Sequence, residues 1–207
     1  MRLSDNLFLR RLHSLAGAVP LGGYLLFHLY ANSFALSGPA VYDEHVRPLR
    51  ELPYLIVIAG GVIFLPLMYH AGYGLYIWYT GQSNILRYGY LRNRLYTKQR
   101  VTGLIVLVFV CYHVYDQVFR PDVSFANVAG SLKNPAVLAL YVLGVSSAAW
   151  HFFMGLWNVF IKWGVTLGEK SQRVTLIVCS TLGIGLVVVG LRAVFAFVDC
   201  CCGGCGG

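Results

Sequence analysis

Five long apolar segments, separated by short polar stretches, dominate the 207-residue chain. They cover residues 14–36, 53–80, 101–119, 136–163 and 174–198. A helix needs about 20 apolar residues to cross the hydrocarbon core of a bilayer, and each segment is close to that length or longer. The pattern predicts an all-α integral membrane protein with five transmembrane helices, formed by a single domain over residues 1–207.

Composition and charge agree with this class. The mean hydropathy is +0.65 and charged residues make up 12% of the chain, about half of the ~25% usual in soluble domains. The net charge of +8 comes from basic residues in short runs between the apolar segments, which suits membrane orientation and argues against a nucleic-acid partner. Eleven lysines and arginines fall on the side of the amino terminus and four on the other side. This bias predicts a cytoplasmic amino terminus and an outer carboxyl terminus.

One histidine lies near the middle of each of the first four segments. These residues are His28, His70, His113 and His151. An ionisable side chain at that depth is costly and usually functional. One imidazole on each of four neighbouring helices is the arrangement that holds two b-type haems, each with its iron between two helices. We therefore expect four of the five helices to form a bundle around two stacked haems.

The depth of each histidine within its charge-free segment predicts which two share an iron. Alternate helices run in opposite directions, so His28 and His113 lie slightly outward of the middle and the other two slightly inward. The offsets are about one to four residues, or ~1.5 to 6 Å along a helix. We predict an outer haem on His28 and His113 and an inner haem on His70 and His151. The second ring nitrogen of each ligand should be held by an acceptor such as a backbone carbonyl.

The second and fourth segments share a pattern of histidine, three residues, glycine, leucine and an aromatic residue. Its glycines, Gly74 and Gly155, lie on the same helix face as the histidine four residues earlier. Without a Cβ they allow a flat macrocycle or another helix to approach, although ordinary helix packing through small residues explains them equally well. The same applies to Gly22, Gly23 and Gly103.

Together these features resemble the cytochrome b subunit of succinate dehydrogenase and fumarate reductase, in the class with one anchor polypeptide and two haems. The resemblance rests on the two glycine motifs, on the run Arg10-Arg11-Leu-His13-Ser14, and on the layout of four histidines and five helices. It covers nearly the whole chain. It implies that a flavoprotein with covalent FAD and an iron–sulfur protein dock on the cytoplasmic face. Electrons from succinate, in the tricarboxylic acid cycle, then pass through the clusters and both haems to a quinone, usually menaquinone.

Four residues are candidates for contact with the cytoplasmic edge of the inner haem. Lys162 lies eleven residues after His151, about three turns along the same helix face, and resembles a propionate partner. The others are His13, Ser14 and Tyr96. His13 is alternatively an interface residue at the membrane edge. The basic loop between the second and third segments either binds an acidic surface of a partner subunit, or only sets the membrane topology and contacts lipid head groups.

Quinone chemistry on the outer side needs protons as well as electrons. Asp116 is the first candidate for a proton relay, because it lies one turn from His113 and nearer the surface. Further candidates are Asp43, Glu44 and Arg192. Asp116 is alternatively an interfacial acid paired with Arg120 or Arg192. Some members of the family use a quinone site on the cytoplasmic side, so the sequence does not decide on which side of the membrane the quinone binds.

Three other functions remain compatible with the sequence. The chain is alternatively a fumarate reductase anchor working in the reverse direction, a dihaem anchor of a nitrate reductase or hydrogenase, or a haem-free transporter whose histidines relay protons. A tail over residues 199–207 carries four cysteines whose spacing matches no closed zinc site, and it receives no function.

Overall fold

The computed structural model describes residues 6–81, 84–118 and 124–201. Over these residues the chain forms helices and no strands, and five helical stretches are long and apolar enough to cross a membrane. They are Leu7–Ser37, Leu55–Thr80, Leu91–Gln117, Pro135–Lys162 and Glu169–Asp199. The prediction of an all-α membrane protein with five spans is confirmed. The tail from residue 202 onward and Arg120 lie outside the described residues.

The first span is interrupted by a π-helical turn. It consists of α1 (Leu7–Ala16), the π turn Gly17–Leu21, α2 (Gly22–Ser33) and a 3₁₀ turn at Phe34–Ser37. Pro20 lies inside the π turn and has no backbone N–H to donate, so the regular hydrogen-bond ladder is broken there. The helix begins at Asn6, whose side chain accepts hydrogen bonds from two backbone amides of the first turn.

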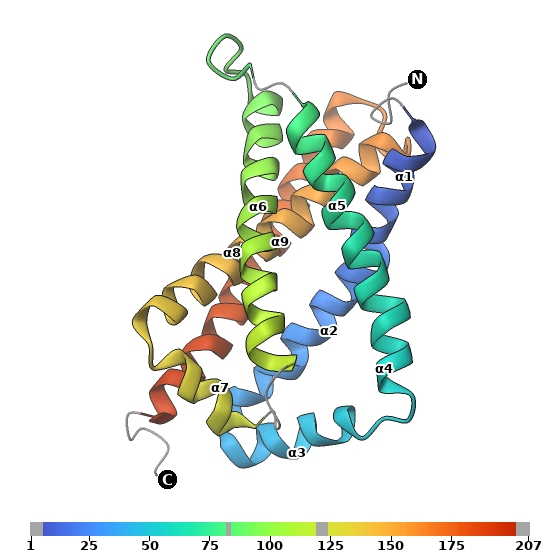
Figure 1. Cartoon of the computed structure of the whole chain (residues 1–207). Coiled ribbons are helices and arrows are strands. Elements are labelled where there is room, and N and C mark those ends of the chain that lie inside the picture. The colour runs from blue at the N-terminus through green and yellow to red at the C-terminus, as the bar shows by residue number, and fades with distance from the viewer. Residues whose placement is uncertain (1–5, 82–83, 119–123, 202–207) are drawn as a thin grey trace.

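The remaining spans complete the bundle. The second contains α4 (Leu55–Ile58), a π turn at Ala59–Phe64 and α5 (Leu65–Thr80). The third, fourth and fifth are α6 (Leu91–Val118), α8 (Pro135–Lys162) and α9 (Glu169–Cys201). α8 packs against α6 and against α9, while α1 packs against α5. Four of these five spans carry the histidines, and α9 lies beside them (Figure 1).

Several helices are longer than the apolar segments predict. α1 begins at Leu7 where the apolar segment begins at residue 14, and α6 begins at Leu91 where the segment begins at residue 101. Hydropathy marks only the part of a helix that crosses hydrocarbon. The additional turns carry arginines and lysines, whose long side chains reach the head-group layer while the backbone stays helical.

Two short helices occupy stretches that the sequence predicts as loops. α3 (Pro39–Arg50) and α7 (Phe125–Leu132) lie together at the end of the molecule opposite the amino terminus (Figure 1). Gly38, with a φ of 99°, reverses the chain before Pro39 starts α3. The Asp43 carboxylate accepts a hydrogen bond of 2.7 Å from the backbone N–H of Phe125 and so joins the two helices. Prolines and charges within α3, and Lys133 and Pro135 directly after α7, make these segments look irregular, although each helix buries apolar residues.

Buried side chains form two apolar clusters. The larger one gathers around α3 and α7 and includes Tyr42, Phe125 and Phe197, whose rings are in contact. The smaller one lies between α8 and α9 and contains Phe153, Met154, Trp157 and Cys179. Many other large apolar side chains are exposed, as expected for helices that face lipid.

Candidate functional site

The four intramembrane histidines lie in two pairs. The ring centroids of His28 and His113 are 5.6 Å apart, with the ring planes at 77°. Those of His70 and His151 are 6.2 Å apart, with the planes at 89°. The first pair joins α2 to α6 and the second joins α5 to α8. These are the same two pairs that the depth of each histidine predicts.

The spacing of each pair fits an iron ion between two imidazoles. Two bonds of about 2.0 Å between a metal and an imidazole nitrogen, with ~1.1 Å from each nitrogen to its ring centre, place the centroids ~6 Å apart. The observed separations are 5.6 and 6.2 Å. Among the described residues, no group of three or more His, Cys, Asp or Glu side chains converges. Two imidazoles are the protein ligands that a b-type haem takes, because the porphyrin supplies the other four nitrogens.

Each histidine of the inner pair is hydrogen bonded to a backbone carbonyl of the facing helix. The Nδ1 of His70 lies 3.0 Å from the carbonyl oxygen of His13, and the Nδ1 of His151 lies 3.1 Å from that of Gln99. With the proton on Nδ1, each ring donates to its carbonyl and keeps the Nε2 lone pair free for a metal. The acceptors have the chemistry expected from the sequence, but the sequence did not indicate which residues supply them.

A glycine on the facing helix gives each inner imidazole its space. A Cβ at Gly17 would lie 2.4 Å from Cε1 of His70, and a Cβ at Gly103 would lie 3.0 Å from Cε1 of His151. A distance of 2.4 Å is shorter than real Cβ atoms allow, so a side chain at Gly17 would clash with the His70 ring. At Gly103 the contact of 3.0 Å would be tight. The sequence indicated Gly103 only as a small residue, and Gly17 was missed because a helical glycine has no distinctive signal.

The motif glycines of α5 and α8 lie opposite the residues that supply the carbonyls. A Cβ at Gly74 would lie 3.5 Å from Cε1 of His13, and a Cβ at Gly155 would lie 3.3 Å from Nε2 of Gln99. A Cβ at Gly74 would thus lie at ordinary contact distance from the His13 ring, whereas a Cβ at Gly155 would be tight against the Gln99 amide. Both glycines make room for a side chain of the facing helix.

These contacts repeat between the two halves of the bundle. In the α1–α5 half the carbonyl residue is His13 and the glycine four positions later is Gly17; in the α6–α8 half they are Gln99 and Gly103. The outer histidine follows the carbonyl residue by 15 positions in the first half and by 14 in the second. The π turn at Gly17–Leu21 takes up the additional residue, so both outer histidines return to the same helix face.

Side chains rather than carbonyls surround the outer pair. The Nδ1 of His113 lies 3.1 Å from the hydroxyl of Tyr141 on α8. The side-chain amide of Asn32 donates to the carbonyl of His28 at 2.8 Å and lies 3.4 Å from its Nε2. The Tyr24 hydroxyl lies 3.5 Å from Nδ1 of His28. Sequence reasoning missed all three, although Tyr24 and Asn32 are each four positions from His28 and therefore share its helix face.

Three buried polar atoms near the inner pair have no partner among the described residues. They are Nδ1 of His13, Oε1 of Gln99 and Nε of Arg100. Burying such an atom without a hydrogen bond costs about 1–3 kcal/mol. The imidazole of His13 stacks on that of His70, and Arg100 donates to the carbonyls of Trp78 and Gly81 at the end of α5. A haem propionate beside these residues would accept hydrogen bonds from Nδ1 of His13 and Nε of Arg100, whereas Oε1 of Gln99, itself an acceptor, would need a donor.

The other predicted cytoplasmic residues have simpler surroundings. The Ser14 hydroxyl donates to the carbonyl of Arg10 within α1 at 2.9 Å. Tyr96 lies beneath the guanidinium of Arg100, 5.3 Å from its ring centroid. Lys162 is exposed at the end of α8 and lies within electrostatic range of His13. None of these three side chains has a hydrogen bond to the inner histidines among those described.

Asp116 is held near the outer pair in a polar environment. It is 8% exposed, and its carboxylate accepts hydrogen bonds of 2.9 Å from the Ser131 hydroxyl on α7 and from the neighbouring Gln117 amide. Asp43 instead caps α7, which is a structural role. Glu44 and Arg192 are exposed.

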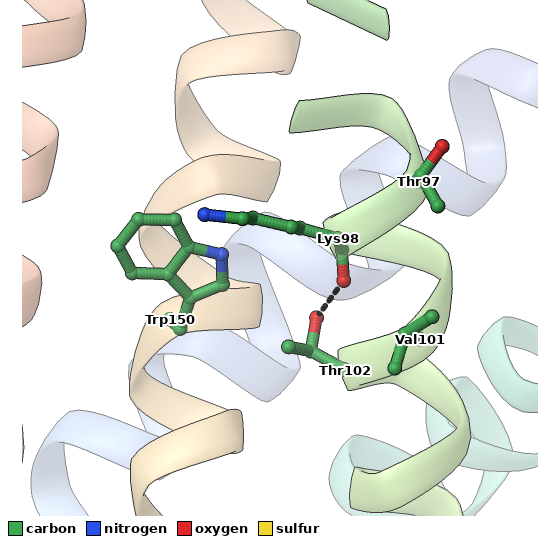
Figure 2. A pocket seen from close by; sticks show the side chains of 5 residues that line it. All are labelled: Thr97, Lys98, Val101, Thr102 and Trp150. Atoms are coloured by element: carbon green, nitrogen blue, oxygen red, sulfur yellow. Dashed lines mark hydrogen bonds between the residues drawn. The ribbon is translucent and has the colours of Figure 1, made fainter. Parts of the chain in front are cut away.

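A surface groove runs between α6 and α8 close to His151 (Figure 2). It has a volume of about 380 Å³ and is lined by Thr97, Lys98, Val101, Thr102 and Trp150. The Lys98 ammonium lies 5.8 Å from the centre of the Trp150 ring. The Thr102 hydroxyl donates to the carbonyl of Lys98 and also lies 3.4 Å from Nδ1 of His151. Thr102 therefore connects the lining of the groove to His151.

Five helices long and apolar enough to span a membrane, with two pairs of histidines between them, place the chain in the class of polytopic helical membrane proteins. Residues 91–191 match the sequence model of the family described as succinate dehydrogenase/fumarate reductase transmembrane subunit. The chain is 41% identical over 195 residues to the succinate dehydrogenase cytochrome b558 subunit of Bacillus subtilis (strain 168), which covers 92% of this chain and 96% of that relative. The chain therefore belongs to the succinate dehydrogenase/fumarate reductase cytochrome b family, as its motifs predicted.

A second relative comes from an archaeon. The succinate dehydrogenase hydrophobic membrane anchor subunit of Thermoplasma acidophilum is 30% identical over 111 residues, which is 52% of this chain and 80% of the relative.

Proposed function

We propose that this chain is the dihaem cytochrome b anchor of a succinate:quinone oxidoreductase. It carries electrons from an iron–sulfur subunit through two b haems to a quinone, while succinate oxidation takes place in the partner subunits. The observation that carries the proposal is the presence of two imidazole pairs whose centroids are 5.6 and 6.2 Å apart. The relative named cytochrome b558 supports haem as the ligand.

His28 and His113 hold the outer haem in this proposal, and His70 and His151 hold the inner one. A haem takes up and releases one electron at a time without needing a proton. The protein keeps each imidazole neutral and correctly turned. For the inner pair, hydrogen bonds from Nδ1 to the carbonyls of facing helices fix the tautomer and make each ring a stronger electron donor to a metal.

The cytoplasmic edge of the inner haem is held by polar and cationic side chains. The unpartnered Nδ1 of His13 and Nε of Arg100 are the donors that a propionate needs. Lys162, within electrostatic range of His13, offsets the propionate charge. Ser14 and Tyr96 lie on the same helices and complete the set of candidates, and Gly74 and Gly155 leave room at this level.

The quinone, for which we propose menaquinone, takes its electrons near the outer haem. Asp116 lies one turn beyond His113 and is held by Ser131 and Gln117, so it is the residue most suited to pass a proton to a reduced quinone. Asp43 and Glu44 on α3 lie at the same end of the molecule and are further candidates, together with Arg192 on α9.

The flavoprotein and iron–sulfur subunits dock on the cytoplasmic face, which we assign to the end with the amino terminus and the α8–α9 turn (Figure 1). Five basic residues support this assignment: Arg87, Arg92, Arg94, Lys98 and Arg100. Of these, Arg92 on α6 donates a hydrogen bond to the side-chain oxygen of Gln172 on α9, so this part of the positive surface joins two helices. The protein would lie in the bacterial cell membrane.

The test is a redox-titrated absorption spectrum of the purified complex, with each ligand replaced in turn. His28→Ala and His113→Ala should remove one haem component, and His70→Ala and His151→Ala should remove the other. A pyridine haemochrome assay should give two protohaems per wild-type chain. Fewer than two protohaems, or losses that combine one residue of each pair, would refute the proposal.

A further inference from the structure

Gln99 contacts the ligand His151 in two ways. Its backbone carbonyl accepts from Nδ1 of His151 at 3.1 Å, and its side-chain amide donates to the carbonyl of His151 at 2.9 Å. The two residues are 52 positions apart, so the paired bonds tie α6 to α8 at the level of the inner pair.

The chain leaves space for this double contact on both helices. Gly155 lies one turn beyond His151, and its missing Cβ would be 3.3 Å from the Gln99 amide nitrogen. Gly103 lies one turn beyond Gln99, and its missing Cβ would be 3.0 Å from the His151 ring. The Gln99 amide therefore packs against Gly155 of α8, and the His151 imidazole packs against Gly103 of α6.

The other half of the bundle has a different side chain at the same position. His13 also supplies a carbonyl to its ligand, His70, and also faces a glycine four residues beyond that ligand. Its side chain, however, stacks on the ligand ring with centroids 4.1 Å apart instead of bonding to the backbone. The carbonyl contact is thus common to both halves, whereas the amide clamp belongs to Gln99.

We infer that Gln99 is a positioning residue of the inner haem, whose side-chain amide holds its own carbonyl against Nδ1 of His151 and thereby sets the redox potential of that haem. This inference rests on the proposed function. Without the clamp, α6 and α8 can separate at this level and the Nδ1 hydrogen bond weakens. A weaker bond makes the imidazole a poorer donor, which favours ferrous over ferric iron and raises the potential.

The experiment is a redox titration of both haems in the purified complex, with Gln99→Leu, Gln99→His and Asn158→Leu beside the wild type. Gln99→Leu should shift the ferric–ferrous equilibrium of the inner haem by up to about tenfold, or ~59 mV upward for one electron, and leave the outer haem unchanged. Gln99→His places the residue of the other half at this position. An imidazole that stacks on the ligand, as His13 does, forms no amide clamp, so this variant should shift the inner potential in the same direction as Gln99→Leu.

Asn158→Leu is the matched control. Its side-chain amide donates to the carbonyl of Met154 within α8 at 2.9 Å and has no described hydrogen bond to either ligand, so neither potential should move. If Gln99→Leu does not assemble, Gln99→Asn, with an amide one methylene shorter, should give a smaller shift in the same direction. An unchanged inner potential at full haem content would overturn this inference alone, and so would equal shifts of both haems. A wild-type complex with fewer than two haems would overturn the proposed function itself.

Discussion

The imidazole of His13 stacks on that of His70, with the ring centroids 4.1 Å apart and the planes within 7° of parallel. The backbone carbonyl of the same residue accepts the hydrogen bond from Nδ1 of His70. One residue at the start of the first span therefore supports the ligand twice. Only the stacking contact can be removed by substitution of the side chain.

His13→Ala should lower the occupancy of the inner haem, because the ligand ring loses its stacked neighbour and the propionate edge loses a donor. His13→Gln, which copies the residue of the other half, should keep both haems. The ratio of the two haem components in the absorption spectrum measures the effect. Ser33→Ala is the control in the same span, since its hydroxyl bonds only to the carbonyl of Tyr30 among the described contacts. Full inner-haem occupancy in His13→Ala would contradict the expected role.

Gly17→Ala should disturb the same haem for a different reason. The added Cβ would lie 2.4 Å from Cε1 of His70, so the ring must move, and overpacking of this kind typically costs about 1–3 kcal/mol. We expect loss or a spectral shift of the inner haem with the outer one intact. Gly23→Ala introduces the same methyl where no atom lies within 4 Å, and it should leave both haems unchanged. Similar spectra for the two variants would show that His70 does not depend on this space.

Asp116→Asn should slow quinone reduction by roughly a hundredfold at normal haem content, because an amide cannot pass on a proton. The measurement is succinate:quinone turnover alongside the haem spectrum. Glu51→Gln, an exposed change directly after α3, should be much closer to the wild type. An unchanged rate in Asp116→Asn would remove this residue from the proton path and leave it as an acceptor for Ser131 and Gln117.

Because of Tyr42, the stability of the folded protein should fall at alkaline pH. Burial, with a smaller contribution from the neighbouring Asp43 carboxylate, raises the pKa of Tyr42 from 10.0 to about 12. Between these values the unfolded chain loses the phenolic proton more readily than the folded one. Stability is therefore fully present below pH 10 and declines as the pH rises toward 12, by on the order of 2 kcal/mol.

Thermal unfolding of the detergent-solubilised complex between pH 9 and 11.5 tests this dependence. Tyr42→Phe should show a flatter decline over that range than the wild type, since it has no proton to lose. Parallel curves for the two proteins would show that other groups determine the alkaline limit.

The membrane spans and the histidine pairs could be predicted from the sequence because both depend on position along the chain. Apolar length fixes each span, and the depth of His28 relative to His70 decides which helix partner each can reach. α3 was not foreseen because it contains two prolines and several charges, which resemble a loop, and α7 because it has only eight residues and is followed by Lys133 and Pro135. Tyr42 and Phe125 show that their apolar faces are nevertheless buried.

The immediate surroundings of the ligands could not be predicted for a different reason. Every residue has a carbonyl, so nothing in the sequence distinguishes His13 or Gln99 as the acceptor for a ligand 57 or 52 positions away. Likewise, Gly17 differs from other helical glycines only through the imidazole of the facing helix. Such contacts are decided by how the helices pack, which sequence periodicity does not specify.

The π turn at Gly17–Leu21 gives the first span a tolerance for length changes that the third span lacks. Removal of one residue from this turn would leave a regular α-helix with His28 still facing its partner. The same deletion between Gly103 and His113 in α6 would rotate His113 by about 100° around the helix axis. The two halves of the bundle are thus unequal in what insertions and deletions they can accept, although they present their imidazoles in the same way.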